Sequence, residues 1–406
     1  MSEKYYIINA ERIIVGTGEV LEDGSAISIE NGSIQAVGTD IAISEDGSII
    51  DAKGMTVMPG LIDAHVHLQG ALPPKPFGRR QAPELTLIKA ADDAKRLVGY
   101  GFTAIRDCGG MNGLHLREAA GLGLIEGMPR IVACGNVLAP TNYGLDDPQL
   151  PEACFDAGTN RGTEFLVSDG VDACLRNSRA AIRNGADFIK IFNSGNYAFP
   201  HCSNHVTMFT EDELRAITGT AQAAEGRIVA AHCQSDDSCR QAILCGVKSI
   251  EHAIGISEET AALGVERGVV YTSALTFAKH EPALNAAVWQ EMITGYANIR
   301  KAGGILAIGS DMNTSPMFPF GENAQELVYL VEYCGYTAQE AITVGTRNGA
   351  IALGLENEIG TVEAGKSADL LIVDGDPLKD IGILANQEAI QKVFLRGTLA
   401  VDRQQN

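Results

Sequence analysis

Short apolar runs alternate with amphipathic segments through the middle of the chain. Between residues 59 and 312, runs rich in β-branched and aliphatic residues are bounded by turn residues, which is typical of buried strands. Helical segments separate most of them, for example over 171–184. Two helical segments, 210–225 and 337–353, open with a Thr-x-x-Glu capping box. The eight predicted strands span 59–67, 103–108, 130–135, 188–195, 227–233, 249–253, 269–275 and 305–312. This alternation predicts an α/β fold, a TIM (β/α)8 barrel, in which chemistry takes place at the C-terminal strand ends.

The two ends of the chain have a different pattern. Residues 4–58 contain short β-rich runs separated by turn signals such as Asn31-Gly32, and they show no helical period. The residues after 359 repeat this pattern. We therefore predict a small β-sandwich domain built from both termini, 1–58 plus 359–406, and a catalytic barrel over 59–358.

Composition narrows the class of protein. The net charge of −20 disfavours nucleic acid and anionic membrane surfaces as partners. Charges interrupt the first apolar stretch, so no signal peptide is predicted, and no apolar run approaches the ~20 residues that span a bilayer. Nine cysteines without a Cys-x-x-Cys pair indicate reduced thiols. We expect a cytoplasmic enzyme acting on a small molecule; the oligomeric state stays open, and a homo-oligomer is compatible with the sequence.

Polar residues recur at the ends of the predicted strands. The pair in "HVH" lies two residues apart on one strand, so both imidazoles face the same side and can chelate one divalent ion. Taken singly, each of the other histidines is more often a hydrogen-bonded core residue. The combination predicts metal binding, since four of the eight histidines fall at strand ends. The candidate ligands are His65, His67, Lys190, His232, His252 and Asp311.

Lys190 is unusual because it lies in the apolar run "DFIKIF". A desolvated ammonium is costly, so a lysine in this position tends to give up its proton.

These segments together resemble the amidohydrolase superfamily. The resemblance rests on "MPGLIDAHVHL", the lone lysine of the fourth strand, "AAHCQ", "SIEHA", "IGSDMN" and the tail "EIGTVEAGKSADLLIVDGDPL", and it covers nearly the whole chain. It is closest to the prolidase-like branch, which includes dipeptidases, carboxypeptidases and ochratoxin-type amidases.

The resemblance implies a centre of two divalent metal ions, with zinc as the default. His65, His67 and Asp311 would hold one ion, and His232 and His252 the other. Lys190, N-carboxylated by carbon dioxide, would bridge the two ions together with a hydroxide. A neutral amine can form such a carbamate, whose two oxygens provide one ligand for each ion.

The implied reaction is hydrolysis of an amide, peptide-like, carbamate-like or urea-like C–N bond. The metal-bridging hydroxide attacks, and Asp311 acts as general acid and base. Asp311, Lys190 and His252 are the predicted catalytic residues. One alternative is a mononuclear deaminase or a cyclic amidine or imidazolone hydrolase, although such enzymes usually lack the strand-4 lysine. Another is a non-catalytic barrel scaffold, although scaffolds of this kind lose metal ligands that this chain keeps.

The substrate side of the site departs from its relatives. They usually carry Gly-Gly-His-Gly after the third strand, where this chain reads "LAPTNYGLDDP". They often have tyrosine or histidine at the position of Gln234, whose amide can donate a hydrogen bond to an oxyanion. The candidate substrate contacts are Tyr143, Asn142, His201, His205 and Gln234, with Lys75, Arg79 and Arg80 as candidates for binding a carboxylate. For the loop residues among them, the alternative is that they shape a solvated loop or balance surface charge.

Overall fold

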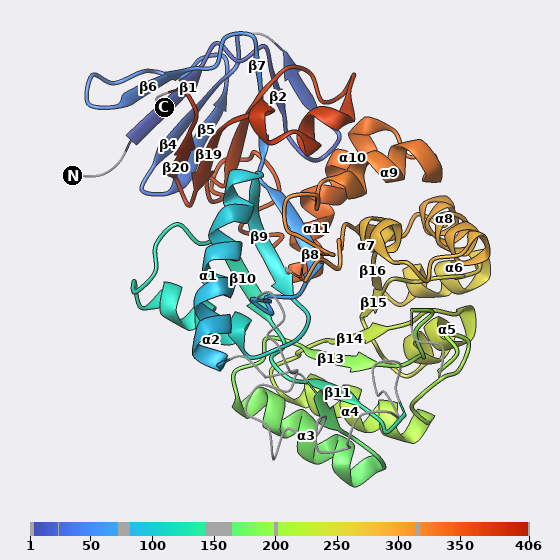
Figure 1. Ribbon diagram of the computed structural model, residues 1–406. Helices are drawn as coiled ribbons and strands as arrows, with labels where there is room; N and C mark the ends of the chain where they lie inside the picture. The colour runs from blue at the N-terminus through green and yellow to red at the C-terminus, as the bar shows by residue number, and fades with distance from the viewer. Residues whose placement is uncertain are drawn as a thin grey trace.

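The computed structural model describes most of the chain. The described residues are 4–22, 24–71, 82–142, 165–198, 202–313, 315 and 317–404. Of the predicted substrate contacts, Tyr143, His201, Lys75, Arg79 and Arg80 therefore lie outside the described residues. In Figure 1 the first and last segments of the chain lie together at the top, above the parallel strands and their helices.

Two sheets form the part of the molecule that contains both chain ends. The first has the strand order β5-β4-β1-β6, and the second β20-β19-β18-β7-β2-β3. Aliphatic side chains from both sheets, such as Ile29 and Ile372, form one buried cluster between them. The strands are β1 Lys4–Ile8, β2 Arg12–Ile14, β3 Val20–Glu22, β4 Ala26–Glu30, β5 Ser33–Gly38, β6 Ser48–Asp51, β7 Met55–Pro59, β18 Leu370–Asp374, β19 Ile390–Leu395 and β20 Thr398–Asp402.

Strand β7 joins the two ends of the chain. It pairs antiparallel with β18, with Met58 opposite Leu371, and parallel with β2. The next strand, β8, begins two residues after β7 ends and belongs to the parallel part of the molecule. The two sheets are therefore joined to the start of β8, the strand that contains His65 and leads directly into His67.

The parallel strands form a TIM-like α/β arrangement. Within the described residues they are ordered β10-β9-β8 in one sheet and β12-β11-β13-β14-β15-β16-β17 in another. Three backbone hydrogen bonds of 2.8–2.9 Å connect β8 and His67 to residues 308–312, just beyond β17. The strands are β8 Leu61–Val66, β9 Phe102–Asp107, β10 Arg130–Ala133, β11 Val137–Ala139, β12 Phe165–Val167, β13 Ile189–Phe192, β14 Val229–His232, β15 Ser249–Glu251, β16 Val270–Thr272 and β17 Ile305–Ala307.

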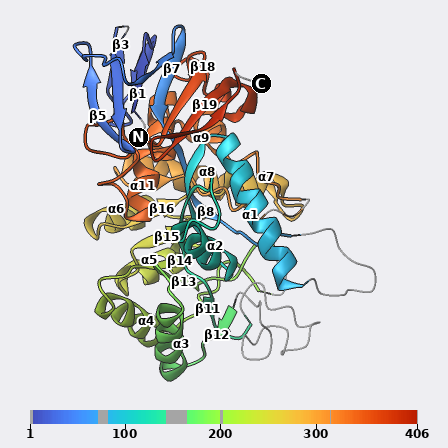
Figure 2. The same cartoon turned by 90° about the vertical axis from the view of Figure 1, so that its left-hand side faces the viewer.

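Helices cover the outside of these strands (Figures 1 and 2). Both predicted capping boxes are confirmed, at Thr210 with Glu213 and at Thr337 with Glu340. No helix in the described part of the chain has the length and apolar character needed to cross a membrane. The helices are α1 Pro83–Gly99, α2 Asn112–Gly121, α3 Val171–Arg183, α4 Glu211–Ala223, α5 Asp236–Leu244, α6 Glu258–Glu266, α7 Leu275–His280, α8 Ala286–Lys301, α9 Gln325–Cys334, α10 Ala338–Gly345 and α11 Arg347–Leu353, with 3-10 turns η3 Ile381–Ala385 and η4 Gln387–Ala389.

The prediction of one helix over 337–353 is wrong in one respect. The backbone leaves the helical region at Thr346, with φ −128° and ψ −89°, and divides the segment into α10 and α11. The two halves have different partners, because α10 packs mainly on α9 and α11 packs on β8 and β17. At Gly349 a Cβ would approach the Ile62 side chain within 2.7 Å, so the helix lies directly against the strand. Tertiary packing therefore determines the break.

Candidate metal centre

The predicted ligands meet at the C-terminal end of the parallel strands. His65 lies in β8 and His67 directly follows that strand; His232 ends β14, and His252 directly follows β15. Asp311 lies four residues beyond β17. The hydrogen bond from the Asp311 N–H to the His65 carbonyl, 2.8 Å long, ties this segment to β8. The site therefore depends on the parallel alignment of strands that are far apart in sequence.

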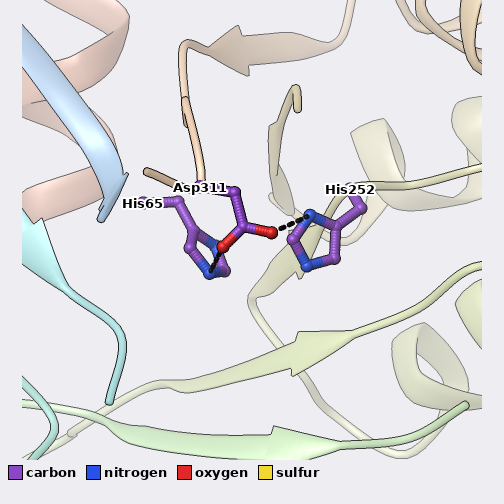
Figure 3. Close-up of side chains that lie close together, drawn as sticks. All are labelled: His65, His252 and Asp311. Atoms are coloured by element: carbon purple, nitrogen blue, oxygen red, sulfur yellow. Dashed lines mark ion pairs between the residues drawn. The ribbon is translucent and has the colours of Figure 1, made fainter. Parts of the chain in front are cut away.

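The Asp311 carboxylate lies between the histidines (Figure 3). Its Oδ1 is 3.5 Å from His65 Nε2 and 3.1 Å from His67 Nε2, and its Oδ2 is 3.9 Å from His252 Nδ1. Two ligand atoms on one tetrahedral zinc, each ~2.1 Å from the ion, lie about 3.4 Å apart. The measured separations fit a shared cation, and ligand atoms of His65, His252 and Asp311 all lie within 4.8 Å of one another.

His232 extends the cluster on the other side. The ring centroids of His232 and His252 are 4.6 Å apart, and those of His65 and His252 are 4.8 Å apart. The Gly195 carbonyl oxygen lies 3.3 Å from His232 Nε2. Because a carbonyl can only accept, this contact places the proton on Nε2 and leaves the lone pair on Nδ1.

Lys190 lies inside this cluster and is 1% exposed. Its Nζ is 3.5 Å from His65 Nε2 and 5.2 Å from the ring centroid of Phe192. Among the described residues no carboxylate oxygen lies within 4.0 Å of this nitrogen. A buried lysine without an acidic partner is rare, because desolvation of the ammonium is costly. Lys190 is therefore a buried lysine that lacks the acidic partner such residues usually have among the described residues.

Burial keeps the imidazoles neutral. Desolvation, followed by the positive charge of Lys190, lowers the pKa of His65 well below its usual range. The same two causes lower the pKa of His232 to about 3. Desolvation and the neighbouring His232 lower the pKa of His252 as well. A neutral imidazole has the lone pair that metal coordination requires, so these groups need not lose a proton before they bind an ion.

Glu251 orients His65 from behind. Its Oε2 lies 2.6 Å from His65 Nδ1, and since a carboxylate only accepts, Nδ1 carries the proton and Nε2 faces Asp311. Arg106, Ser249 and Thr272 also donate to this carboxylate, at 2.8, 2.6 and 2.7 Å. Although burial opposes it, the charge of Arg106, then of Lys190, lowers the pKa of Glu251, so the acceptor stays ionised.

A second buried carboxylate, Asp63, positions the Asp311 segment. Its two oxygens accept from the N–H groups of His65 and Ser310 at 3.1 Å, from Ser310 Oγ at 2.6 Å, and from Asn323 Nδ2 at 2.9 Å. Burial raises the pKa of Asp63 to about 6. The sequence analysis missed Asp63, Glu251 and Arg106. The sequence feature that could have identified them is a charged residue inside a predicted strand whose other residues are mostly apolar.

Two of the predicted ligands lie on strained backbone. His252 and Asp311 have φ values of 67° and 58°, in the left-handed region that residues other than glycine seldom adopt. Such strain is maintained only where the surrounding structure determines it, and it is concentrated at functional sites.

Cys108 lies near His65 and Glu251, but it does not extend the centre. Desolvation raises the pKa of the buried Cys108 thiol, so the thiolate that a metal needs is disfavoured. The Glu251 carboxylate is already engaged by four donors.

Three of the predicted substrate contacts, Asn142, His205 and Gln234, lie within the described residues. Asn142 and His205 are exposed. Gln234 is 3% exposed, and its Oε1 accepts from the Tyr197 N–H at 2.9 Å. Their roles remain predictions.

Comparison with known proteins identifies the family of this chain. The sequence model of the amidohydrolase family matches residues 56–400. Ochratoxinase from Aspergillus niger is 28% identical over 431 residues, covering 98% of this chain and 86% of that protein. A prolidase solved with N-methylphosphonate-L-proline has a TM-score of 0.86 and 29% identity, covering 98% of this chain and 100% of that chain. A Xaa-Pro dipeptidase with bound methionine has a TM-score of 0.83 and 28% identity, covering 98% and 99%.

Proposed function

Because this chain belongs to the amidohydrolase family, we propose that it is a metal-dependent hydrolase that cleaves the C–N bond of an amide, peptide-like, carbamate-like or urea-like substrate. The observation that carries the proposal is the meeting of four imidazoles, the Asp311 carboxylate and a buried Lys190 at one end of the parallel strands. This donor set of imidazoles and a carboxylate suits divalent cations.

The centre is proposed to be binuclear. His65, His67 and Asp311 would hold one ion, while His232 and His252 would hold the other. Lys190, carboxylated by carbon dioxide, would reach both. Its burial, its distance of 3.5 Å from His65 Nε2 and its lack of a described acidic partner support this role. A carbamate replaces an ammonium by an anion, which offsets part of the charge of two dications.

The chemistry divides between the ions and the protein. Two divalent ions, zinc by default, would polarise the scissile carbonyl and acidify water to hydroxide near neutral pH. Asp311 accepts the proton released as the nucleophile adds to the carbonyl carbon and delivers it to the leaving nitrogen. The side-chain exposure of Asp311, 16%, gives it access to substrate, while His65 beside it is fully enclosed. Glu251 keeps His65 in the tautomer that the centre needs.

The relatives support a substrate class. One is a Xaa-Pro dipeptidase, one is a prolidase solved with a proline derivative, and one is an ochratoxinase. We therefore place N-acyl amino acids and dipeptides first among candidate substrates.

Within the fold, we propose a closed eight-stranded barrel over 59–358 and a β-sandwich domain made of 1–58 plus 359–406. The hydrogen bonds between β8 and residues 308–312 support closure, and the pairing of β7 with β18 supports the shared domain.

Hydrolysis by metal-replete protein tests the proposal. Zinc-loaded protein is assayed against N-acyl amino acids, dipeptides, lactams, carbamates and ureas, with chelator-treated protein as the control. We expect turnover that is lost with the metal and restored by zinc. Bound metal is counted in the same preparation, and a 13C carbamate signal is sought after incubation with labelled bicarbonate. One ion per chain and no carbamate signal would instead favour a mononuclear deaminase or ring hydrolase, which can use the His65, His252 and Asp311 group alone.

A further inference from the structure

Tyr197 has a hydroxyl group that the described protein leaves unused. The hydroxyl oxygen is buried and makes no hydrogen bond to any described residue. The comparable hydroxyls of Tyr271 and Tyr296 donate to the carbonyls of Ala261 and His252, at 3.0 and 2.9 Å. An unpaired buried hydroxyl is destabilising, so its presence calls for a partner that the fold does not supply.

The backbone places Tyr197 beside the metal centre. Gly195, two residues earlier, has its carbonyl oxygen 3.3 Å from His232 Nε2. The Tyr197 N–H donates to Oε1 of Gln234 at 2.9 Å, and Gln234 lies two residues after His232. The tyrosine is thus held next to a candidate ligand at two successive points.

Gln234 is itself fixed in place. Its N–H donates to Ser194 Oγ at 2.9 Å, and its carbonyl accepts from Asn204 Nδ2 at 3.0 Å. Ser194, Gln234 and Asn204 are all buried. Because the amide oxygen of Gln234 is occupied by the Tyr197 backbone, the clearest function of Gln234 is to hold the tyrosine loop.

The hydroxyl lies in the field of the catalytic carboxylate. Burial, followed by the negative charges of Asp311 and Glu281, raises the pKa of Tyr197, so the hydroxyl keeps its proton. A hydroxyl that keeps its proton can donate to a substrate oxygen on which negative charge develops.

We propose that the Tyr197 hydroxyl donates a hydrogen bond to the carbonyl oxygen of the scissile bond, with Gln234 as its positioning residue. This inference rests on the proposed function. As hydroxide forms a bond to the carbonyl carbon, the π electron pair moves to the carbonyl oxygen. This oxygen accepts a hydrogen bond from the Tyr197 hydroxyl. When the pair returns, the C–N bond breaks and the nitrogen leaves with the proton from Asp311. The tyrosine keeps its own proton throughout.

Tyr197→Phe tests the donor directly. Loss of one oxyanion donor costs ~100-fold or more in kcat. Because the interaction strengthens only in the transition state, kcat and kcat/KM should fall together while KM is unchanged. The N-acyl amino acid or dipeptide that wild type hydrolyses fastest in the panel above serves as the probe. Metal content should stay at the wild-type level, and the melting temperature should not fall, since no hydrogen bond is lost.

Tyr271→Phe is the matched control. It removes a buried hydroxyl that has a partner away from the centre, so it should lower the melting temperature and leave kcat unchanged. Equal kcat for wild type and Tyr197→Phe would overturn the inference, as would a loss of melting temperature as large as that of Tyr271→Phe. Wild-type protein inactive against the whole panel would instead overturn the proposed function on which the inference rests.

Gln234→Met tests the positioning role. It removes the acceptor of the Tyr197 N–H and should lower kcat. If Gln234 acts through the tyrosine, the double variant Tyr197→Phe/Gln234→Met should be no slower than Tyr197→Phe alone. If the fold decrease in kcat of the double variant equals the product of the decreases of the two single variants, Gln234 acts independently of Tyr197. This result would overturn its positioning role.

Discussion

Replacing Glu251 by glutamine should weaken both the fold and the metal centre, for two separable reasons. The Glu251 carboxylate lies between the guanidinium of Arg106, at 2.8 Å, and the ring of His65, at 2.6 Å. All three side chains are buried. Glutamine keeps the shape but removes the negative charge that faces Arg106 and weakens the acceptor that orients His65.

The two costs have different magnitudes and different measurements. Removing one partner of a buried ion pair leaves an uncompensated charge and costs about 3–5 kcal/mol of unfolding free energy. Loss of a carboxylate behind a metal-binding histidine typically weakens metal binding about 10–100-fold. The first cost belongs to the polypeptide and should appear without metal. The second should appear only on metal titration.

The assay compares urea unfolding of chelator-treated proteins with zinc titration against a chromogenic chelator. Thr272→Val is the matched control, because Thr272 donates a neutral hydrogen bond to the same carboxylate at 2.7 Å and its removal should cost only about 1 kcal/mol. The double variant Arg106→Met/Glu251→Gln removes the unpaired charge. It should regain part of the lost stability while metal binding stays weak.

Two outcomes would refute this reasoning. If Glu251→Gln is no less stable than Thr272→Val, the buried charge pair does not have the stated effect. If zinc binds Glu251→Gln as tightly as wild type, Glu251 does not orient His65.

Further variants test the proposed centre. Lys190→Ala should lose most of the roughly two metal ions per chain that are expected for a bridged pair. If this variant keeps both its metal content and its activity, Lys190 does not bridge the two ions. Asp311→Asn should keep the fold but lower turnover by about 10²–10⁴-fold, since an amide cannot transfer the proton; near-normal kcat would exclude Asp311 from that role. Asp63→Ala should cost at least about 3 kcal/mol of unfolding free energy in chelator-treated protein, because four donors lose a buried acceptor. A change under about 1 kcal/mol would mean that the segment before Asp311 is held by other contacts.

Much of the architecture could be read from local patterns. Each of the eight predicted runs overlaps an observed parallel strand, because a buried strand needs a short run of β-forming residues between turn residues. Both Thr-x-x-Glu segments begin helices, since this cap satisfies backbone donors within four residues of sequence. The helix break at Thr346 could not be read in this way, because the partners of α10 and α11 lie elsewhere in the chain.

Part of the candidate site could also be predicted from local sequence patterns. The spacing of His65 and His67 on one strand predicted a shared face, and their ring centroids are 5.3 Å apart. The sequence also placed His232, His252 and Asp311 at strand ends, and the parallel strands bring them together. Their roles as ligands remain predictions.

The sequence by itself determined the element pattern and the set of donors that could meet at one end of the strands, because these depend on periodicity and strand direction. The tertiary structure decided which groups act behind those donors. Arg106 and Glu251 are 145 residues apart and His65 and Glu251 are 186 apart, so no local pattern links them. Likewise, only the folded chain reveals that Gln234 is bound to the Tyr197 backbone and that the Tyr197 hydroxyl has no described partner. Which side chains meet across parallel strands depends on strand register and on what fills the space between strands, and both are properties of the packed molecule.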